Sequence, residues 1–225
     1  MDILEAIEKR HSVRVYKDEP IAEDVRQKLN TFVEDCVKDS GLTIKVVYDD
    51  PEIFDSRLAH YGNFKNANNL IILAGDKNND NDEKCGYYGE KIVLYAQTLG
   101  LNTCWAALTF SRGKVRKMLD EGDRLCVVIA FGYGENDGAE RKSKSIEEVV
   151  GSKGDMPDWF KKGVEAALLA PTAVNQQKFK FGIKDGEPVA VVSGRGPCVK
   201  VDLGIAKYHF EVASGRKVIN SVKKD

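Results

Sequence analysis

The sequence lacks the patterns that mark the commonest metal and nucleotide sites. It has only three histidines, and its five cysteines form no C-x-x-C pair (Cys36, Cys85, Cys104, Cys126 and Cys198). Because zinc sites need clustered cysteine and histidine, we expect no metal and reduced, mostly buried thiols. Neither a G-x-G-x-x-G after the first predicted strand nor a G-x-x-x-x-G-K-[ST] occurs. Rossmann-type and P-loop nucleotide binding therefore lose support.

A strong charge bias and a long apolar run are also missing. The net charge is -1, which argues against a general binder of nucleic acid or anionic membranes. No apolar stretch could span a bilayer, and Met1-Asp2-Ile3 lacks the basic-then-apolar order of a signal peptide. Hydrophobic residues make up 42%, which predicts a packed core. We expect a cytoplasmic protein without nucleic-acid or membrane partners.

The apolar periodicity predicts helices and strands mixed along the chain, without strict βαβ alternation. Helices are predicted at 2–9, 20–40, 85–99, 114–119, 157–169 and 201–214, the fifth of them capped by Asp155 and Pro157. Strands are predicted at 42–48, 70–74 and 125–131, and a hairpin at 179–183 and 189–192. We expect the tail after Arg216 to be a surface strap or a frayed end. This pattern indicates an α+β sandwich, with residues 1–150 in a first lobe and 151–225 in a shorter second lobe.

The segment Arg10-His11-Ser12-Val13-Arg14 combines two guanidinium groups with a hydroxyl after the first predicted helix. In an extended segment, side chains two residues apart point to the same side, so Arg10, Ser12 and Arg14 could converge on one ligand. Each guanidinium can donate two parallel hydrogen bonds to anionic oxygen atoms, which favours a phosphate. The alternative is a solvated basic patch at a helix end.

Three further segments could surround a ligand. Residues 100–108 (GLNTCWAAL) join a helix end to small residues whose backbone N–H groups could approach a ligand, or they form a buried corner with Trp105 in the core. Residues 141–144 (RKSK) could hold an anion or be a solvated charge run. Residues 170–177 (APTAVNQQ) leave a helix in an extended form because of the proline, and they present hydroxyl and amide groups. A plain polar turn is the alternative for this last segment.

In combination, the four segments resemble those of the FMN-dependent nitroreductases. Residues 10–14 are similar to the R-x-S-x-[RK] segment that holds the flavin phosphate in that family, and Lys142-Ser143-Lys144 is similar to its basic K-x-[RK] pair. Residues 100–108 are similar to the G-L-G-x-x-W segment, where a backbone amide meets the flavin N5. Residues 170–177 are similar to the A-P-S-x-x-N-x-Q segment.

The resemblance implies a nitroreductase-like sandwich of a mixed, mainly antiparallel sheet with helices, and a bound FMN. It also implies a ping-pong cycle in which NAD(P)H reduces FMN and a nitroaromatic, quinone or similar small acceptor reoxidises it. No side chain is assigned a catalytic role. The residues implied to bind the cofactor are Arg10, His11, Ser12, Arg14, Asn63, Trp105, Ala106, Ala107, Leu108, Lys142, Lys144, Pro171, Thr172, Ala173, Asn175 and Gln176.

The order of the segments departs from that of the common homodimeric members. In those proteins the A-P-S-x-x-N-x-Q segment follows the second helix, whereas here residues 33–41 contain nothing like it and the segment lies beyond residue 150. The chain thus resembles the tandem nitroreductase-like subgroup, in which two diverged half-copies are fused. We expect one FMN site within a monomeric pseudo-dimer. Two alternatives stay open, a flavin-binding sensor or storage module without turnover, and a degenerate fold used for interaction.

Overall fold

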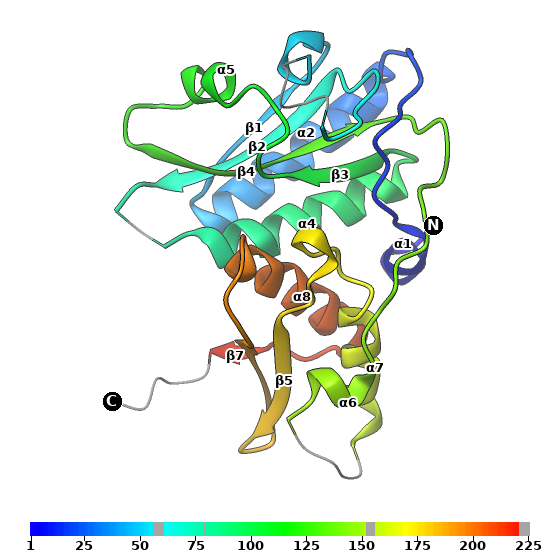
Figure 1. The fold of residues 1–225 in the computed structure, drawn as a ribbon, viewed down its shortest axis with the longest axis vertical. Helices are drawn as coiled ribbons and strands as arrows, with labels where there is room; N and C mark the ends of the chain where they lie inside the picture. Colours follow the sequence, from blue (N-terminus) through cyan, green and yellow to red (C-terminus); the bar gives the residue numbers. More distant parts are fainter. Residues whose placement is uncertain (56–60, 79, 152–155, 221–225) are drawn as a thin grey trace.

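The computed structural model describes residues 1–55, 61–78, 80–151 and 156–220. Figure 1 shows a four-stranded sheet above helix α4, helix α8 below α4, and a smaller sheet below α8. The helices are α1 (Ile3–Lys9), α2 (Glu23–Ser40), α4 (Asp82–Thr98), α5 (Arg112–Lys117), α6 (Ile146–Val149), α7 (Asp158–Ala167) and α8 (Val199–Ser214), with short 3-10 helices at Pro51–Ile53 and Ala173–Asn175. The strands are β1 (Thr43–Val47), β2 (Asn69–Asp76), β3 (Asn102–Ala106), β4 (Asp123–Gly132), β5 (Phe179–Lys184), β6 (Glu187–Val192) and β7 (Ile219–Asn220). The predicted α+β sandwich is confirmed.

The first sheet has the strand order β1-β2-β4-β3, and all its neighbouring strands are antiparallel. Strand β2 is buried on both faces because its side chains alternate between two clusters. Ile71 and Leu73 belong to the cluster that contains residues of α4, while Leu70 and Ile72 belong to the one that contains Val115 of α5. The predicted strand at 70–74, buried on both faces, is therefore confirmed.

Helices α4 and α8 approach so closely that the contact requires glycine on both of them. A Cβ atom on Gly204 would collide with the carbonyl oxygen of Glu83 and lie 2.7 Å from the backbone nitrogen of Tyr87. A Cβ atom on Gly86 would collide with the carbonyl oxygen of Val201. These neighbours are backbone atoms, which cannot move aside by a change of rotamer. The two glycines therefore set the distance between α4 and α8.

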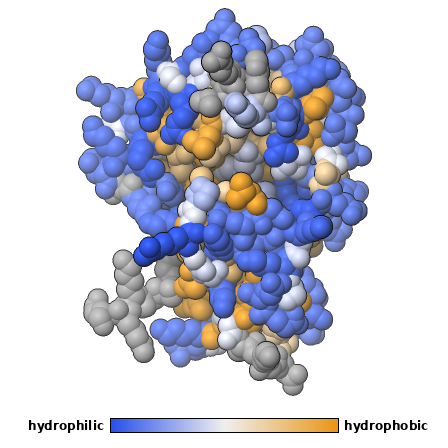
Figure 2. Space-filling model, in the orientation of Figure 1, coloured by the Kyte–Doolittle hydropathy of each residue, from blue (hydrophilic) through white to orange (hydrophobic). Residues whose placement is uncertain are grey.

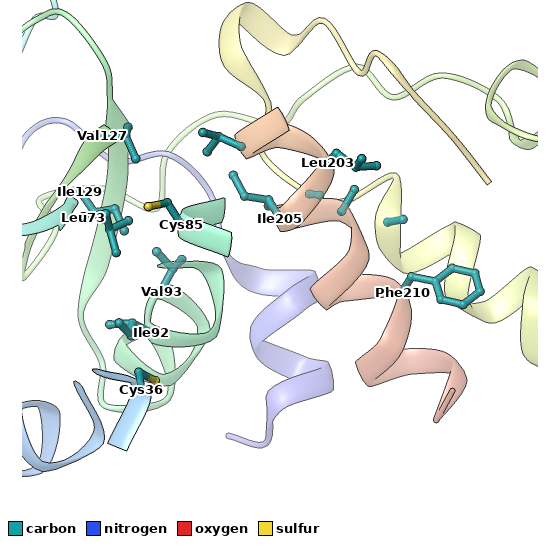
Figure 3. Close-up of a cluster of buried hydrophobic side chains, with 14 of the residues drawn as sticks. Cys36, Leu73, Cys85, Ile92, Val93, Val127, Ile129, Leu203, Ile205 and Phe210 are labelled. Atoms are coloured by element: carbon teal, nitrogen blue, oxygen red, sulfur yellow. The ribbon is translucent and has the colours of Figure 1, made fainter. Parts of the chain in front are cut away.

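Helix α8 is packed on two sides. In Figure 3, Ile205 lies on the side of α8 that faces α4 and the first sheet, whereas Phe210 points away toward α7. The ring of Phe210 stacks on that of Phe181 in β5, with 4.8 Å between centroids and 10° between planes. One cluster of buried hydrophobic residues thus extends from Leu73 in the first sheet to Phe181 in the second. The cluster crosses the predicted lobe boundary at residue 150.

The second sheet begins with the predicted hairpin. Strands β5 and β6 are antiparallel and are joined by Asp185 and Gly186, which both have a positive φ. Strand β7 then pairs with β6 in parallel, with Val189 opposite Ile219. The expectation of a strap or frayed end after Arg216 is wrong for residues 219–220, because β6 offers an edge with which they pair. The predicted cap residue Asp155 lies outside the described residues.

The segment after α1 runs along the edge of the first sheet. Ser12 bridges Thr103 of β3 in parallel, and the backbone nitrogen of Val13 donates to the Thr103 carbonyl at 3.0 Å. The Tyr16 hydroxyl, which is buried, donates to the carbonyl of Val13 at 2.7 Å. The predicted extended geometry of residues 10–14 thus comes from pairing with β3. In the described part of the chain, no helix is both long and apolar enough to cross a membrane.

Candidate functional site

A cavity of about 270 Å³ lies between two walls from distant parts of the sequence. The first wall consists of residues before position 150, namely Ser12, Arg14, 105–109 and Val127. The second wall consists of residues 171–174, Pro197, Cys198, Val201, Asp202 and Ile205. Leu108 on the first wall is 68% exposed and Val174 on the second is 88% exposed. Figure 2 shows a mostly hydrophilic face with apolar residues only in small patches. Exposed apolar side chains are therefore uncommon on this face, and their presence on both walls of the cavity favours a partly apolar ligand.

Ser12 and Arg14 of the first wall, together with the neighbouring Arg10, act on the thiol of Cys104 in β3. Burial raises the pKa of this thiol, while the charges of Arg14 and Arg10 and a hydrogen bond with Ser12 act in the opposite direction. Arg10, Ser12 and Arg14 therefore lie on one side of the segment, as their spacing predicts. Their exposure increases along the segment, because Arg10 is buried, Ser12 is half-buried and Arg14 is exposed.

Arg10 also belongs to a buried group of charges centred on Glu90 of α4. The Arg10 Nε lies 3.6 Å from the Glu90 Oε1, and both side chains are at most 1% exposed. The His209 Nε2 lies 2.8 Å from the same oxygen, and the Trp105 Nε1 donates to the Glu90 Oε2 at 3.0 Å. Burial alone would raise the pKa of Glu90, but these partners hold it below its usual value. An ionised Glu90 therefore holds together α8, β3 and the N-terminal segment.

Arg141 supplies a second guanidinium beside Arg10. Its Nη2 lies 3.4 Å from the Arg10 carbonyl oxygen, to which it donates. Burial, followed by the positive charge of Arg10, lowers the pKa of Arg141 to about 10. Within the described residues, three buried nitrogen atoms of this pair have no hydrogen-bond acceptor, Nε and Nη1 of Arg10 and Nε of Arg141. Two adjacent cations with unused donors are suited to an anion.

The second wall contains a strained backbone segment. Val174, Asn175 and Gln177 have φ values of 47°, 54° and 45°, a region that is costly for a β-branched residue such as Val174. Hydrogen bonds hold the segment in place. The Ala173 backbone nitrogen donates to the Asp202 Oδ1 at 2.9 Å, and the Gln176 Nε2 donates to the Asp202 Oδ2 at 2.7 Å.

The basic run 141–144 meets this segment through backbone contacts. The carbonyl of Lys142 accepts from Asn175 Nδ2 at 2.8 Å and from Gln177 Nε2 at 3.0 Å. The Lys144 Nζ donates to the Gln177 carbonyl at 2.8 Å. The Lys142 side chain is exposed and the Lys144 amine is engaged, so neither lines the cavity. Their contacts connect the chain after β4 to the second wall.

The structure brings many of the predicted site residues together at the cavity. Those that line it are Ser12, Arg14, Trp105, Ala106, Ala107, Leu108, Pro171, Thr172 and Ala173. The others lie outside its lining, namely Arg10, His11, Asn63, Lys142, Lys144, Asn175 and Gln176. Sequence reasoning included Arg141 only as a member of the run 141–144, and it did not single out Glu90 or Asp202. A carboxylate within the apolar face of a helix is the signal that could have drawn attention to Glu90 and Asp202.

Residues 2–214 match the model of the family described as "Putative TM nitroreductase". The chain belongs to this family. A "putative nitroreductase" of Thermotoga maritima matches over 100% of this chain and 91% of its own, with 25% identity and a TM-score of 0.73. A "putative nitroreductase" of Desulfovibrio desulfuricans, solved in complex with FMN, shares the fold over 69% of this chain and 99% of its own (20% identity, TM-score 0.55).

A third nitroreductase-like structure is that of the "putative NADH dehydrogenase/NAD(P)H nitroreductase" of Parabacteroides distasonis. It shares the fold over 65% of this chain and 95% of its own, at 23% identity and a TM-score of 0.52. No curated protein matches the chain. Membership of the nitroreductase family supports a flavin oxidoreductase in general terms. Within the described residues, no group of three or more His, Cys, Asp or Glu side chains could hold a metal ion.

Proposed function

We propose that this nitroreductase-family protein binds FMN in the cavity and uses NAD(P)H to reduce a nitroaromatic, quinone or similar small acceptor. One observation carries the proposal. The cavity, whose walls bear exposed apolar side chains, is lined by Trp105, and Trp105 donates to Glu90, the ion-pair partner of Arg10. Beside this pair, Nη1 of the buried Arg10 and Nε of the half-buried Arg141 have no hydrogen-bond acceptor within the described residues. A planar apolar ring system with an anionic tail fits both features.

The residues present suit FMN in particular. Arg10 and Arg141 carry two positive charges, whereas Glu90 supplies a single negative charge near them. The same Glu90 carboxylate also accepts a hydrogen bond from His209. A terminal phosphate would supply acceptors for the free N–H groups of the two arginines, with Ser12 and Arg14 adding a hydroxyl and a further guanidinium at the cavity. Nothing in the sequence suggests a unit for the adenine of FAD. We therefore infer that FMN is the resident flavin.

Each wall would have its own part in the reaction. Bound FMN supplies the hydride chemistry, and the protein binds, orients and tunes it. Small side chains at Ala106 and Ala107 allow backbone N–H groups to approach a ligand that gains negative charge. Pro171, Thr172 and Ala173 face the same cavity from the other wall and would contact the ring system and ribityl chain. Leu108 and Val174 would exclude water from the reacting face.

We further propose that one chain forms one complete site. Both walls belong to the same polypeptide, and the close α4–α8 contact joins the segments before and after residue 150. In this proposal, α4 and α8 correspond to one another in two diverged half-copies, and their contact replaces the interface between two subunits. The protein would then function as a monomer with one FMN per chain.

The colour and chemistry of the purified protein test the proposal. We expect the protein to be yellow, and mass spectrometry of the released cofactor to identify FMN. Adding NADH or NADPH under anaerobic conditions should bleach the flavin absorbance, and adding a quinone should restore it. Recovery of FAD would contradict the cofactor assignment. A bound flavin that neither nucleotide bleaches would instead support a sensor or storage module.

Arg141→Ala should weaken FMN binding roughly 10- to 100-fold, because a charge-assisted hydrogen bond contributes about 1.5–3 kcal/mol. The adjacent Lys142→Ala is the matched control, since the Lys142 side chain is exposed and outside the cavity. We expect this control to change affinity less than about threefold, as for a surface charge. Titration of FMN into the apo forms of both variants makes the comparison. Similar losses of FMN affinity in both variants would show that Arg141 does not bind the phosphate directly.

A further inference from the structure

Asp202 is a buried carboxylate that reaches the cavity from the first turn of α8. It is 3% exposed, and both of its oxygen atoms are occupied by the second wall. Oδ1 accepts from the Ala173 backbone nitrogen at 2.9 Å, and Oδ2 accepts from the Gln176 Nε2 at 2.7 Å. Gln176 uses the same Nε2 to donate to the Pro197 carbonyl at 2.7 Å. One side chain thus holds both ends of the turn at residues 173–176.

This turn needs an external support. It contains Val174 and Asn175 in the left-handed region, and Gln177 follows in the same region. Such conformations persist only where surrounding contacts determine them. The Val174 side chain is left 88% exposed at the cavity. Without the carboxylate, the segment could relax to ordinary backbone angles, and the second wall would change shape.

The position of Asp202 is unfavourable for folding. Its hydrogen bonds come from an amide N–H and a side-chain amide, and no salt bridge to it is formed within the described residues. Burial raises the pKa of Asp202 to about 6, although the bonds from Ala173 and Gln176 act against this. A raised pKa means that ionisation lowers the stability of the folded state above that pH. A charge kept at such a cost, on the wall of a cavity, points to a functional role.

We propose that Asp202 is a positioning residue that fixes the turn at residues 173–176 as the second wall of the flavin site. The carboxylate acts through the turn and needs no contact with the reacting atoms. The inference rests on the proposed function for its ligand, but the state of the turn can be measured without any ligand. Asp202 and the turn are thus testable separately from FMN binding.

Asp202→Asn tests the role while keeping the shape of the side chain. The asparagine oxygen can still accept from Ala173, but its NH2 group faces the donor of Gln176. We expect amide hydrogen exchange across residues 173–177 to become at least 10-fold faster in the ligand-free variant. FMN affinity at pH 8 should fall at least 10-fold, while the melting temperature stays the same or rises because a buried charge is removed. Asp158→Asn, an exposed residue in the first turn of α7, is the control and should change none of these.

The pH profile separates positioning from a general loss of structure. Below about pH 6 the wild-type carboxylate becomes protonated and loses an acceptor, so the wild-type advantage in FMN affinity over Asp202→Asn should shrink toward pH 5. The phosphate of FMN titrates in both proteins alike, so the ratio of affinities is the quantity to follow. Within the described residues, the Cys198 thiol is the titratable group whose charge interacts with Asp202, and burial raises its pKa, so it stays neutral in this range.

Gln176→Ala provides a second test, because Gln176 is only half-buried and its loss should leave the fold intact. It should weaken FMN binding at least threefold, and the double variant with Asp202→Asn should bind no more weakly than Asp202→Asn alone. Unchanged exchange in residues 173–177, FMN affinity within twofold of wild type, or additive losses would each overturn the proposal. Faster exchange in Asp202→Asn with no FMN binding by the wild type would instead support the role of Asp202 in the turn and refute the flavin assignment.

Discussion

Gly204→Ala should lower the free energy of unfolding by about 3 kcal/mol, near the upper end of the usual cost of overpacking. The added methyl group would meet the backbone of Glu83 and Tyr87, so α8 could accommodate it only by moving away from α4. That displacement would also move Val201, Asp202 and Ile205, which line the cavity. We therefore expect weaker FMN binding as well as a lower denaturation midpoint in urea.

Gly113→Ala is the matched control for this change. Gly113 lies in helix α5, has no atom within 4 Å of an added Cβ, and does not line the cavity. Alanine is favoured over glycine in a helix, so stability should be unchanged or rise by up to about 1 kcal/mol. If Gly204→Ala were as stable as Gly113→Ala, the contact between α4 and α8 would tolerate a side chain at residue 204, and glycine would not be required there.

Glu90→Gln should destabilise the protein by about 3–5 kcal/mol, the usual cost of removing one partner from a buried ion pair. The amide could still accept from Trp105, but the Arg10 and His209 side chains would lose their negative partner. Glu34→Gln on the exposed side of α2 should change stability by less than about 0.5 kcal/mol. Urea denaturation of both variants at pH 7 makes the comparison.

The pH dependence of the Glu90 effect follows from the direction of its pKa shift. Since its partners hold the pKa of Glu90 below the usual value, Glu90 stabilises the fold above its unfolded-state pKa. This contribution is lost as the pH falls through the folded-state pKa. The difference between wild type and Glu90→Gln should therefore be largest at neutral pH and shrink in acid. A difference that stays constant from neutral pH into acid would show that Glu90 acts by packing alone.

The fold was largely predictable because its helices and strands have strong local signals. The end of α2 at Ser40 is one example, since Gly41 takes the left-handed conformation that ends many helices. The strand at 70–74 and the hairpin around Gly186 are others. Strand β7 was missed because a pairing of two residues with a distant edge leaves almost no periodic pattern.

The site was less predictable, because burial of a charge is decided by tertiary packing. The spacing of Arg10, Ser12 and Arg14 predicts that their side chains point to the same side of the segment. It does not reveal that Arg10 is buried in an ion pair with Glu90. Within the run 141–144, residue type alone cannot indicate that Arg141 lies beside Arg10 while the Lys142 side chain points to solvent. Local motifs pointed to residues on both walls of the cavity, whereas they did not point to the carboxylates Glu90 and Asp202. Glu90 and Asp202 act across contacts between elements far apart in the sequence.

The two walls of the cavity also constrain when the site can exist during synthesis. The cavity draws on Ser12 near the start of the chain and on Ile205 in α8. Residues 12–205 must therefore have left the ribosome before a ligand can be enclosed, so the proposed flavin cannot guide the folding of the first sheet. In a cell short of flavin, the newly made chains should reach a folded apo form on their own, with Arg10 and Arg141 adjacent and only Glu90 as their negative partner. Flavin supply would then affect how long each molecule survives after folding, by stabilising the native state, more than whether it folds.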